Sequence, residues 1–395
     1  MSAGTGGAGG AAGPALVSHV TATYGPSLAE SVERLVAPFG GWTAIVSPGE
    51  RIAVKVNLLR AAEPGQAVTT HPETLRCVLR GLRSAGARPF VADSPGGPNP
   101  PMKVARVWRL SGLDEVCRQE QVELRDVEDE AVALPSPSGR LFRSFPVSRS
   151  FTDADGIVQV GVLKTHQLMR LTGGVKLTFG CIPGLTKPTL HVRLPERADF
   201  AEMLLDLHLA LAPRFTIIDG IVAMQGQGPG GGDPVELDSL FAASDAVALD
   251  AALAVRTAHR LESVHTLAAA AGRGLIDLGR PFELAGDPLI AATGFVPARR
   301  DLADRIPHVA WRVGRRILTA RPRVVIPDAC IQCGECERIC AAGACDVGDL
   351  PRFSDDTCVR CYACVEVCPE RAIDALNPPL VRMVQRLTPR RSRTR

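Results

Sequence analysis

Short apolar runs alternate with amphipathic stretches along the chain up to about residue 298. The run 157–163 is apolar almost throughout, which is typical of a strand buried on both faces. The stretch 196–211 instead repeats apolar residues at helical spacing. Between 51 and 92, strand, helix and strand follow one another with short connections, which predicts a βαβ unit in a parallel sheet. We therefore predict an α/β domain, a mostly parallel sheet with flanking helices.

The same pattern gives approximate limits for each element. The glycine-containing segment 171–184 has no steady period, so we expect a shaped loop with at most a short helix there. A basic stretch, 299–318, has helical spacing and would connect this domain to the remainder of the chain. We expect strands at 51–58, 87–92, 122–126, 157–163, 215–219, 240–243 and 281–285, a hairpin at 131–150, and helices at 27–36, 70–84, 104–110, 113–118, 196–211, 245–255 and 260–272.

Polar or glycine-rich residues follow four of the expected strands. Ligands of parallel sheets bind beyond the carboxyl ends of the strands, so these positions should converge on one site. The loop 226–232 is rich in glycine and can either approach an anion with its backbone N–H groups or act as a lid. The four strand ends carry Lys55 with Asn57, Asp93 with Ser94, Lys164 with His166, and Asp219 with Gly220.

Lysine is scarce in this chain. Of 45 basic residues, five are lysine, namely Lys55, Lys103, Lys164, Lys176 and Lys187. A G+C-rich coding bias explains the excess of arginine, and a lysine that persists under such a bias can mark a need for its compact, titratable ammonium group. We expect Lys55, Lys164 and Lys176 to form a cationic pocket that binds a carboxylate or phosphate, or donates a proton. His166 lies two residues from Lys164 on the same strand face and is a candidate acid or base.

Twelve cysteines are present, and eight of them form two runs of the pattern C-x2-C-x2-C-x3-C, offset by 28 residues. Zinc sites pair two C-x2-C units, and disulfide frameworks belong to small secreted domains, so neither fits. In two-cluster bacterial ferredoxins the fourth cysteine of each run ligates the other cluster. We expect two [4Fe-4S] clusters, held by Cys330, Cys333, Cys336 and Cys368, and by Cys358, Cys361, Cys364 and Cys340. Cys345 falls where the repeat has an apolar residue and should belong to the core.

Composition narrows the range of functions. A net charge of +3 and an aromatic content of 4% do not favour nucleic-acid binding. No apolar run approaches the roughly 18 residues of a membrane span, and the first residues lack the features of a signal peptide, so we expect a cytoplasmic protein. The expected organisation is a Gly/Ala-rich tail at 1–17, an α/β domain at 18–298, a helical linker at 299–325, a small α+β ferredoxin domain at 326–376 and a basic tail at 377–395.

A series of short motifs follows one another along the chain. They are Lys55-Val-Asn57, Thr70-His-Pro72, Asp93-Ser-Pro-Gly96, Lys164-Thr-His166, Gly174-Val-Lys176, Phe179-Gly180, Asp219-Gly220 and Ser244-Asp-Ala-Val-Ala-Leu-Asp250.

In this order the motifs resemble the family called domain of unknown function 362, in which a fused ferredoxin unit is common. The resemblance implies this fold and the clusters, and points to Gly174 beside Lys176 as part of the site, but implies little about the substrate. The chain departs from the family by having valine at position 56, where proline is frequent, and Leu177 where asparagine is frequent. A more remote resemblance to nickel-pincer lactate racemases carries no reaction over.

These features favour an iron–sulfur oxidoreductase. Electrons would arrive from a ferredoxin, a flavodoxin or a reductase and pass to a small anionic substrate, unsaturated or carbonyl-containing. Lys164, His166, Lys176 and Lys55 would be catalytic, and Asn57, Asp93, Ser94, Gly174 and Asp219 would bind the substrate. Two alternatives remain: an electron-transfer subunit whose α/β domain docks a partner enzyme, and a redox-sensing binding or maturation protein.

Overall fold

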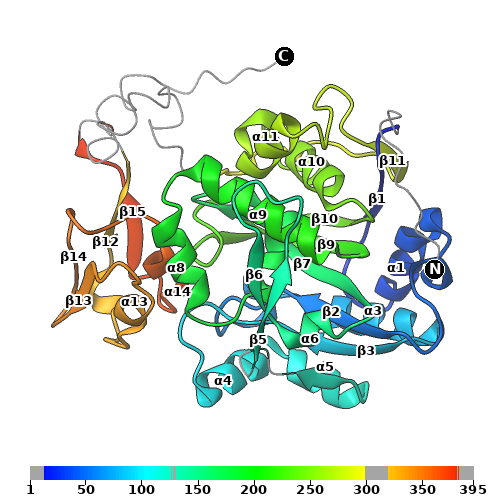
Figure 1. Ribbon diagram of the computed structural model, residues 1–395, viewed down its shortest axis with the longest axis horizontal. Helices are drawn as coiled ribbons and strands as arrows, with labels where there is room; N and C mark the ends of the chain where they lie inside the picture. The colour runs from blue at the N-terminus through cyan, green and yellow to red at the C-terminus, as the bar shows by residue number, and fades with distance from the viewer. Residues whose placement is uncertain (1–12, 126, 128–129, 299–318, 380, 382–395) are drawn as a thin grey trace.

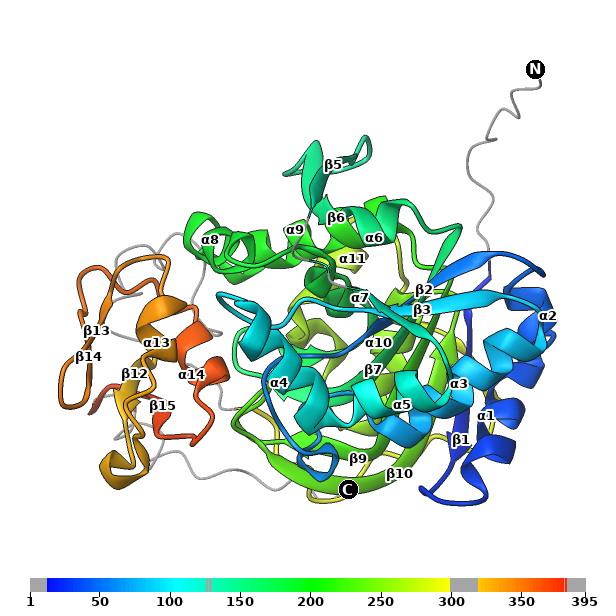
Figure 2. The same ribbon diagram turned by 90° about the horizontal axis from the view of Figure 1, so that it is seen from below.

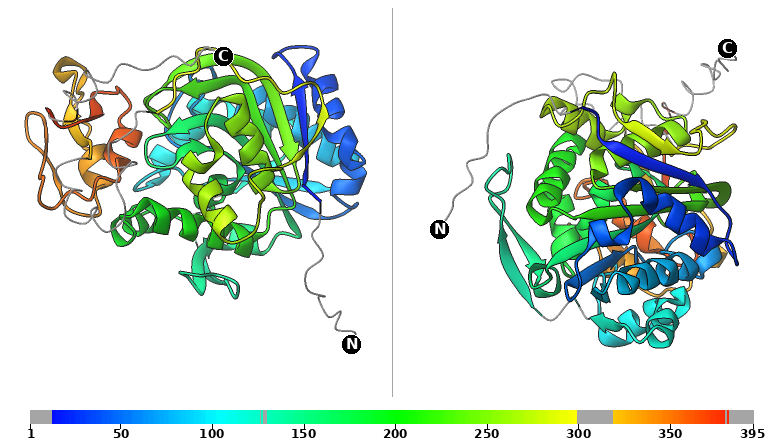
Figure 3. Two further views of the ribbon diagram at one scale, coloured as in Figure 1. Left: turned by 90° about the horizontal axis from the view of Figure 1, so that it is seen from above. Right: turned by 90° about the vertical axis from the view of Figure 1, so that its right-hand side faces the viewer.

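The computed structural model describes residues 13–125, 127, 130–298, 319–379 and 381. Within these residues the chain forms a large α/β domain and, from residue 319 onward, a small region of short strands and helices (Figure 1). The small region lies at one end of the molecule, and β1 (Leu16–Thr21) and α1 (Leu28–Val36) lie at the other (Figure 3). The α/β domain therefore meets the small region at one end of its strands, away from β1 and α1.

The α/β domain is built on one mixed sheet, with the strand order β11-β1-β10-β9-β7-β2-β3-β4 and β8 beside β7 among the described residues. The run β9-β7-β2-β3-β4 is parallel, whereas β10 pairs antiparallel with both of its neighbours. The expected mostly parallel sheet is thus confirmed. Its strands after β1 are β2 (Arg51–Val56), β3 (Arg88–Ala92), β4 (Glu123–Arg125), β7 (Gly156–His166), β8 (Arg170–Thr172), β9 (Phe215–Gln225), β10 (Asp233–Ala243) and β11 (Glu283–Gly286).

Helices cover both faces of this sheet (Figure 2). Side chains alternate along a strand, so in β2 Ile52 and Val54 face one helical layer and Ala53 faces the other. The first layer contains α1, α3 (Pro72–Ser84), α4 (Pro101–Ser111) and α5 (Leu113–Gln119), with α2 (Trp42–Ile45) beside them. The second contains α7 (Gly174–Leu177), α9 (Arg197–Leu211), α10 (Ala246–Arg256) and α11 (His265–Gly272), with α6 (Arg149–Thr152) and the hairpin of β5 (Ala131–Pro135) and β6 (Ser144–Ser148) at its side.

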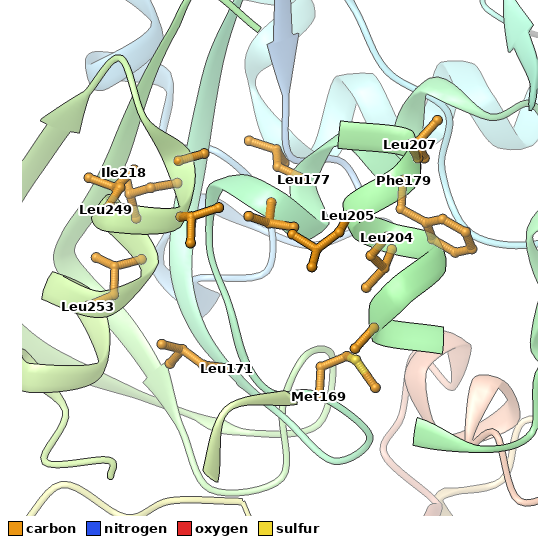
Figure 4. Close-up of a cluster of buried hydrophobic side chains, with 14 of the residues drawn as sticks. Met169, Leu171, Leu177, Phe179, Leu204, Leu205, Leu207, Ile218, Leu249 and Leu253 are labelled. Atoms are coloured by element: carbon orange, nitrogen blue, oxygen red, sulfur yellow. The ribbon is translucent and has the colours of Figure 1, made fainter. Parts of the chain in front are cut away.

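The second layer has a core that fixes the segment between β8 and α8 (Thr186–Arg193). Leu177, Phe179, Leu204 and Leu205 all belong to this core (Figure 4), and Phe179 meets Phe200 of α9 edge-on with ring centres 5.5 Å apart. Each fully buried leucine or phenylalanine contributes about 1.5–3 kcal/mol to the free energy of unfolding. This packing holds α7 and the turn after it in place, and with them the lysine that α7 carries.

The strands are longer in places than the sequence predicted. β7 was expected to end at residue 163 and runs to His166, so Lys164 lies inside the strand. β9 was expected to end at Asp219 and continues to Gln225, because β10 pairs with it as a long hairpin. Strand β1 was not foreseen and begins inside the segment assigned to the N-terminal tail. The predicted connector at 299–318 and most of both tails lie outside the described residues. No helix in the described part of the chain is both long and apolar enough to cross a membrane.

The small region begins earlier than expected. Strand β12 (Arg321–Val324) pairs antiparallel with β15 (Ile373–Leu376) and closes the two cysteine runs between them. Within the described ranges, the small region forms two ion pairs with the α/β domain that join a lysine or an arginine to a carboxylate. Lys103 lies 2.7 Å from Glu335, and Arg371 lies 3.3 Å from Asp233. The other elements of this region are α13 (Glu335–Arg338), β13 (Cys345–Val347), β14 (Pro351–Phe353) and α14 (Ala363–Val367).

Candidate functional site

A cavity of about 100 Å³ lies between the α/β domain and the small region. It opens at the carboxyl ends of β2, β3 and β7, the place where parallel sheets bind their ligands. Helices α7 and α8 form one wall, and residues of α14 and the end of α13 form the opposite wall. Its polar lining comprises Lys55, Asn57, Asp93, Ser94, Lys164, Thr172, Lys176, Lys187, His191 and Glu366.

Lys55 and Asp93 form an ion pair of 2.8 Å at the floor of the cavity, and both side chains are almost completely buried. Asp93 also accepts hydrogen bonds from the backbone N–H groups of Leu58 and Ser94. Gly180 packs directly on this pair, since a Cβ at that position would lie 2.2 Å from the carboxylate and 2.6 Å from the ammonium. This ion pair binds the ammonium of Lys55 to a carboxylate of the protein, whereas we expected that ammonium to face a substrate.

Lys164 is buried on β7, and its ammonium donates a hydrogen bond of 2.8 Å to the carbonyl of Val68. Burial, together with the neighbouring charge of Lys176, lowers the pKa of Lys164 to about 7. A lysine with such a pKa exchanges a proton near neutral pH, as a general acid must.

His166 is fully buried beside the cavity. Its Nδ1 accepts hydrogen bonds from the backbone N–H groups of Leu168 and Met169, at 3.0 and 3.3 Å. The neutral ring therefore carries its proton on Nε2, which lies 3.4 Å from Oε1 of Glu366. Burial and the nearby lysines hold the pKa of His166 well below its usual range. The expected exchange of protons by His166 at neutral pH is not favoured, and its Nε2 N–H makes no hydrogen bond within the part of the chain that the structure describes.

Lys176 extends from α7 into the cavity. Its Nζ lies 5.7 Å from the centre of the Phe179 ring, and it makes no hydrogen bond to any described residue. Burial lowers the pKa of Lys176, with Glu366 opposing this effect. Lys187, from α8, contrasts with it, because its ammonium donates to the backbone carbonyls of Ser94 and Ile182. Lys176 thus presents an ammonium group whose hydrogen bonds are left for a ligand.

Aromatic rings line the wall formed by α8. The imidazole of His191 stacks on Phe200 with ring centres 4.2 Å apart, and Phe179 meets it edge-on at 5.6 Å. Burial lowers the pKa of His191 to about 3, so its ring is neutral. On the other side, Oδ1 of Asn57 is buried without a hydrogen-bond partner among the described residues. The cavity therefore combines an apolar wall with several convergent polar groups, which is typical of small-molecule sites.

Glu366 was not foreseen as a site residue, although it comes from the cysteine-rich region. It belongs to α14 and reaches the cavity with a side chain that is 13% exposed. Burial raises the pKa of Glu366 to about 6, although Lys176 and Lys164 act in the opposite direction. Its place between two cysteines of the second run gave no signal of a role at a distant pocket. Lys187, which follows the expected shaped loop, was likewise not assigned to the site.

The structure brings most of the predicted site residues together. Of the candidates, six line the cavity and His166 contacts one of its lining residues. Two do not line it. Gly174 begins α7, and its backbone N–H donates a hydrogen bond to Asp250. Asp219 accepts hydrogen bonds from the hydroxyl groups of Thr74 and Tyr24 on the other side of β9. The six that line the cavity are Lys55, Asn57, Asp93, Ser94, Lys164 and Lys176.

The eight repeated cysteines surround two hollows in the small region. One hollow is lined by Cys330, Cys333, Cys336 and Cys368, and the other by Cys340, Cys358, Cys361 and Cys364. Each hollow thus takes three cysteines from one run and the fourth from the other, the donor set that crossed [4Fe-4S] ligation requires. Cys345 lines neither hollow and is buried in the apolar core of this region.

The second hollow and the cavity share a wall. Pro188, Ile339 and Ala363 line both of them, so one layer of side chains separates the two spaces. Glu366 lies between Cys364 and Cys368 in the chain and enters the cavity from the same helix. The first hollow shares no lining residue with the cavity.

Comparison with known proteins agrees with the division of the chain into an α/β domain and a cysteine-rich region. A family model described as Domain of unknown function (DUF362) matches residues 52–255. Two models described as 4Fe-4S binding domain match residues 327–343 and 351–374. These matches support iron–sulfur binding and electron transfer by the small region.

One curated relative and one solved structure illustrate the similarity. The thylakoid-associated protein sll1697 of Synechocystis sp. is 35% identical over 226 residues, which are 57% of this chain and 68% of that protein. The lactate racemase apoprotein of Thermoanaerobacterium thermosaccharolyticum aligns with a TM-score of 0.37 at 15% identity, over 59% of this chain and 54% of that one. The latter likeness is too low to carry an inference. On the family model and the curated relative, the chain belongs to the family described as Domain of unknown function (DUF362).

Proposed function

We propose that this protein is an iron–sulfur oxidoreductase that reduces a small organic substrate in the cavity. The observation that carries the proposal is the shared wall of Pro188, Ile339 and Ala363 between the cavity and the hollow of the second cysteine set. A protein that merely carried electrons would not need a cavity lined by buried lysines at that place. The cysteine-rich region and the α/β domain would then act as one unit.

The cysteines would hold two [4Fe-4S] clusters in the crossed arrangement. Cys330, Cys333, Cys336 and Cys368 would hold one, and Cys358, Cys361, Cys364 and Cys340 the other. When bound, such clusters supply single electrons at low potential. Cys333 is exposed and belongs to the hollow that is separate from the cavity, so a protein donor such as a ferredoxin, a flavodoxin or a reductase would approach there.

The residues of the cavity would bind the substrate and supply protons. Reduction of one C=C or C=O bond takes two electrons, which the protein donor supplies one at a time, and two protons. Lys176 would bind the anionic group of the substrate, since its ammonium has no hydrogen-bond partner among the described residues. Lys164 would give the first proton, because a pKa of about 7 makes it an acid near neutral pH. The second proton would come from solvent after Lys164 is reprotonated.

The other residues in and beside the cavity would position reacting groups or exclude water and would not react themselves. Nε2 of His166 lies 3.4 Å from Oε1 of Glu366 and would help to keep that carboxylate at the cavity wall, although the two atoms share no hydrogen bond. Phe179 and Leu177 line the same space and would limit the access of water. With less water, the charges of the lysines act more strongly on a bound anion.

Reoxidation of the reduced protein tests this proposal. The protein would be reduced without oxygen and mixed with a panel of small unsaturated and carbonyl acids, and reoxidation would be followed optically. The proposal expects reoxidation by one class of small compound, slowed about 100-fold or more in Lys164→Ala. Lys103→Ala, which removes a lysine outside the cavity lining, should retain the activity.

Other outcomes would favour the alternatives. Reoxidation by protein acceptors alone, unchanged in Lys164→Ala, would make the chain an electron-transfer subunit. No turnover, combined with a ligand affinity that changes with the state of the clusters, would make it a redox-sensing binding protein. Either result would contradict the proposed oxidoreductase.

A further inference from the structure

The cavity holds an excess of positive charge. Four lysines line it, namely Lys55, Lys164, Lys176 and Lys187, and two carboxylates face them, Asp93 and Glu366. When all six are charged, the balance is two positive charges, because the two neighbouring histidines are neutral. Uncompensated buried charge is costly in the folded state. The cavity is therefore preorganised for a ligand of opposite charge.

No further carboxylate of the described residues lines the cavity, although thiolate-ligated clusters held across the shared wall would oppose the excess. Arg60, from the loop after β2, is buried nearby and donates to the backbone carbonyls of Ala61 and Gly230, which adds another positive charge. The groups facing Lys164 are thus Lys55 and Asp93 from β2 and the end of β3, His166 from β7, Lys176 from α7, Lys187 and His191 from α8, Arg60, and Glu366 from α14.

The four ammonium groups differ in what they offer a ligand. Lys55 forms an ion pair with Asp93. Lys164 donates a hydrogen bond to one backbone carbonyl, and Lys187 donates to two. Carbonyls satisfy hydrogen bonds but leave the formal charge unmatched. Lys176 has neither a hydrogen bond nor an ion pair within the described residues. A ligand would therefore bind directly to Lys176 and be attracted by the field of Lys164 and Lys187.

We propose that the cavity binds a small organic dianion, in which two negative groups face Lys176 and the Lys164 side of the cavity. This inference rests on the proposed function and names the class of its substrate. A monoanion of equal size would match one fewer of these positive charges. The cavity, with a volume of about 100 Å³, has room for a short dicarboxylate or a small phosphorylated acid.

Calorimetric titration of the intact, oxidised and cluster-loaded protein tests the charge of the ligand. Succinate and its monoamide, succinamate, have nearly the same size and differ by one negative charge. Fumarate, with methyl phosphate and inorganic phosphate, completes the panel and separates a dicarboxylate from a phosphorylated ligand. We expect at least one dianion to bind about 10-fold or more tightly than its matched monoanion. Phosphate bound with no preference for an organic dianion would mean an adventitious ion only and would overturn the proposal.

Two substitutions move the charge of the cavity in opposite directions. Lys176→Met removes the available ammonium and should weaken dianion binding about 10- to 100-fold. Glu366→Gln removes a negative charge of the protein and should tighten binding instead. Damage to the fold would weaken binding in both variants, so the opposite signs separate charge from misfolding. Bound iron, measured in both variants, shows that the cysteine sites are intact.

Proton uptake gives an independent test. The pKa of Lys164 is about 7, and a dianion beside it favours the charged ammonium, so the complex should have a higher pKa. Binding at pH 8 should therefore take up to about one proton from the buffer, and affinity should fall as pH rises from 7 to 8.5. Titration in two buffers of different ionisation enthalpy measures the uptake. In Lys164→Arg, whose charge is permanent, the uptake should be lost.

The outcomes distinguish this inference from the proposed function. If no dianion binds better than its monoanion while small acceptors still reoxidise the protein, the ligand class is wrong and the oxidoreductase stands. If dianions bind as expected without any turnover, the ligand class stands and the oxidoreductase is wrong. If no anion binds at all, the lysines balance the negative charge of thiolate-ligated clusters across the shared wall, and the dianion proposal is overturned.

Discussion

The cysteine-rich region and the lysine-lined cavity are both built to hold something charged, and they are encoded in opposite ways. Every cysteine of the two ligand sets lies between Cys330 and Cys368, at spacings that fix its position by local geometry. The lysines of the cavity are spread from Lys55 to Lys187, and β2, β7, α7 and α8 bring them together. One site depends on local sequence and the other on the order of strands in the sheet.

The difference has consequences for how each site responds to change. A ligand cysteine has a direct chemical role that its neighbours cannot replace. A cavity lysine acts through charge, and each of the four has a different set of partners. Substitutions should therefore affect the cysteine region in an all-or-none manner and the cavity in graded steps.

The largest effect should come from a ligand cysteine. Cys364→Ser removes one donor of the second hollow and should lower bound iron by about half, because one of two clusters is lost. Cys345→Ala, which changes a cysteine that lines neither hollow, should retain the iron. Analysis of iron and sulfide measures both. Equal losses in the two variants would mean that the ligand sets are assigned incorrectly.

A large but graded effect should follow from breaking the ion pair at the floor of the cavity. Asp93→Asn leaves the ammonium of Lys55 buried without a carboxylate, which should lower the free energy of unfolding by about 3–5 kcal/mol. Urea unfolding followed by circular dichroism measures the change. The double variant Lys55→Met with Asp93→Leu should recover much of the loss, and a loss in the double variant that equals the sum of the single ones would argue against a coupled pair.

A smaller loss of stability should come from changing Gly180, which packs on the ion pair of Lys55 and Asp93. In Gly180→Ala the new methyl group would overlap the Asp93 carboxylate and the Lys55 ammonium, at a cost of about 1–3 kcal/mol in the free energy of unfolding. Gly272→Ala places a methyl group where nothing lies within 4 Å and should change stability by less than about 0.5 kcal/mol. If the two variants unfold alike, the close approach at Gly180 is not a constraint.

The smallest effect should come from the contact between the two parts of the chain. Lys103 and Glu335 form an ion pair whose side chains are each 21% exposed, so Lys103→Met should lower the free energy of unfolding by no more than about 1 kcal/mol. The loss should shrink in high salt, because screening weakens the pair in the parent protein as well. A loss that is larger, or that does not depend on salt, would point to a packing role for the lysine stem.

The elements of the fold were predictable where a pattern was local. Helix α3 was expected at 70–84 and runs over Pro72–Ser84, where the His71 side chain accepts a hydrogen bond from the Glu73 N–H. The limits of β7 and β9 were missed, because their extensions pair with the antiparallel strands β8 and β10. Such antiparallel pairing depends on which strands lie next to each other in the sheet, and the order of strands cannot be predicted from a single sequence.

The candidate site was predictable in part for the same reason. Residues at strand ends, such as Asn57 and Lys164, could be grouped because parallel strands end at one edge of a sheet. Asp219 was grouped with them and does not line the cavity, since its strand continues past it as half of a hairpin. Glu366 could not be foreseen, because its role depends on how the cysteine-rich region docks and no local motif records that.

The central claim is that the cavity and the cysteine-rich region work as one unit. Anaerobic redox titration of the protein with and without a saturating dianion, followed by electron paramagnetic resonance, tests it most directly. A negative charge bound across the shared wall should disfavour reduction at the second cysteine set, so the midpoint potential there should fall and that of the first set should change less. The shift should vanish in Lys176→Met. Unchanged potentials despite demonstrated binding would contradict the claim.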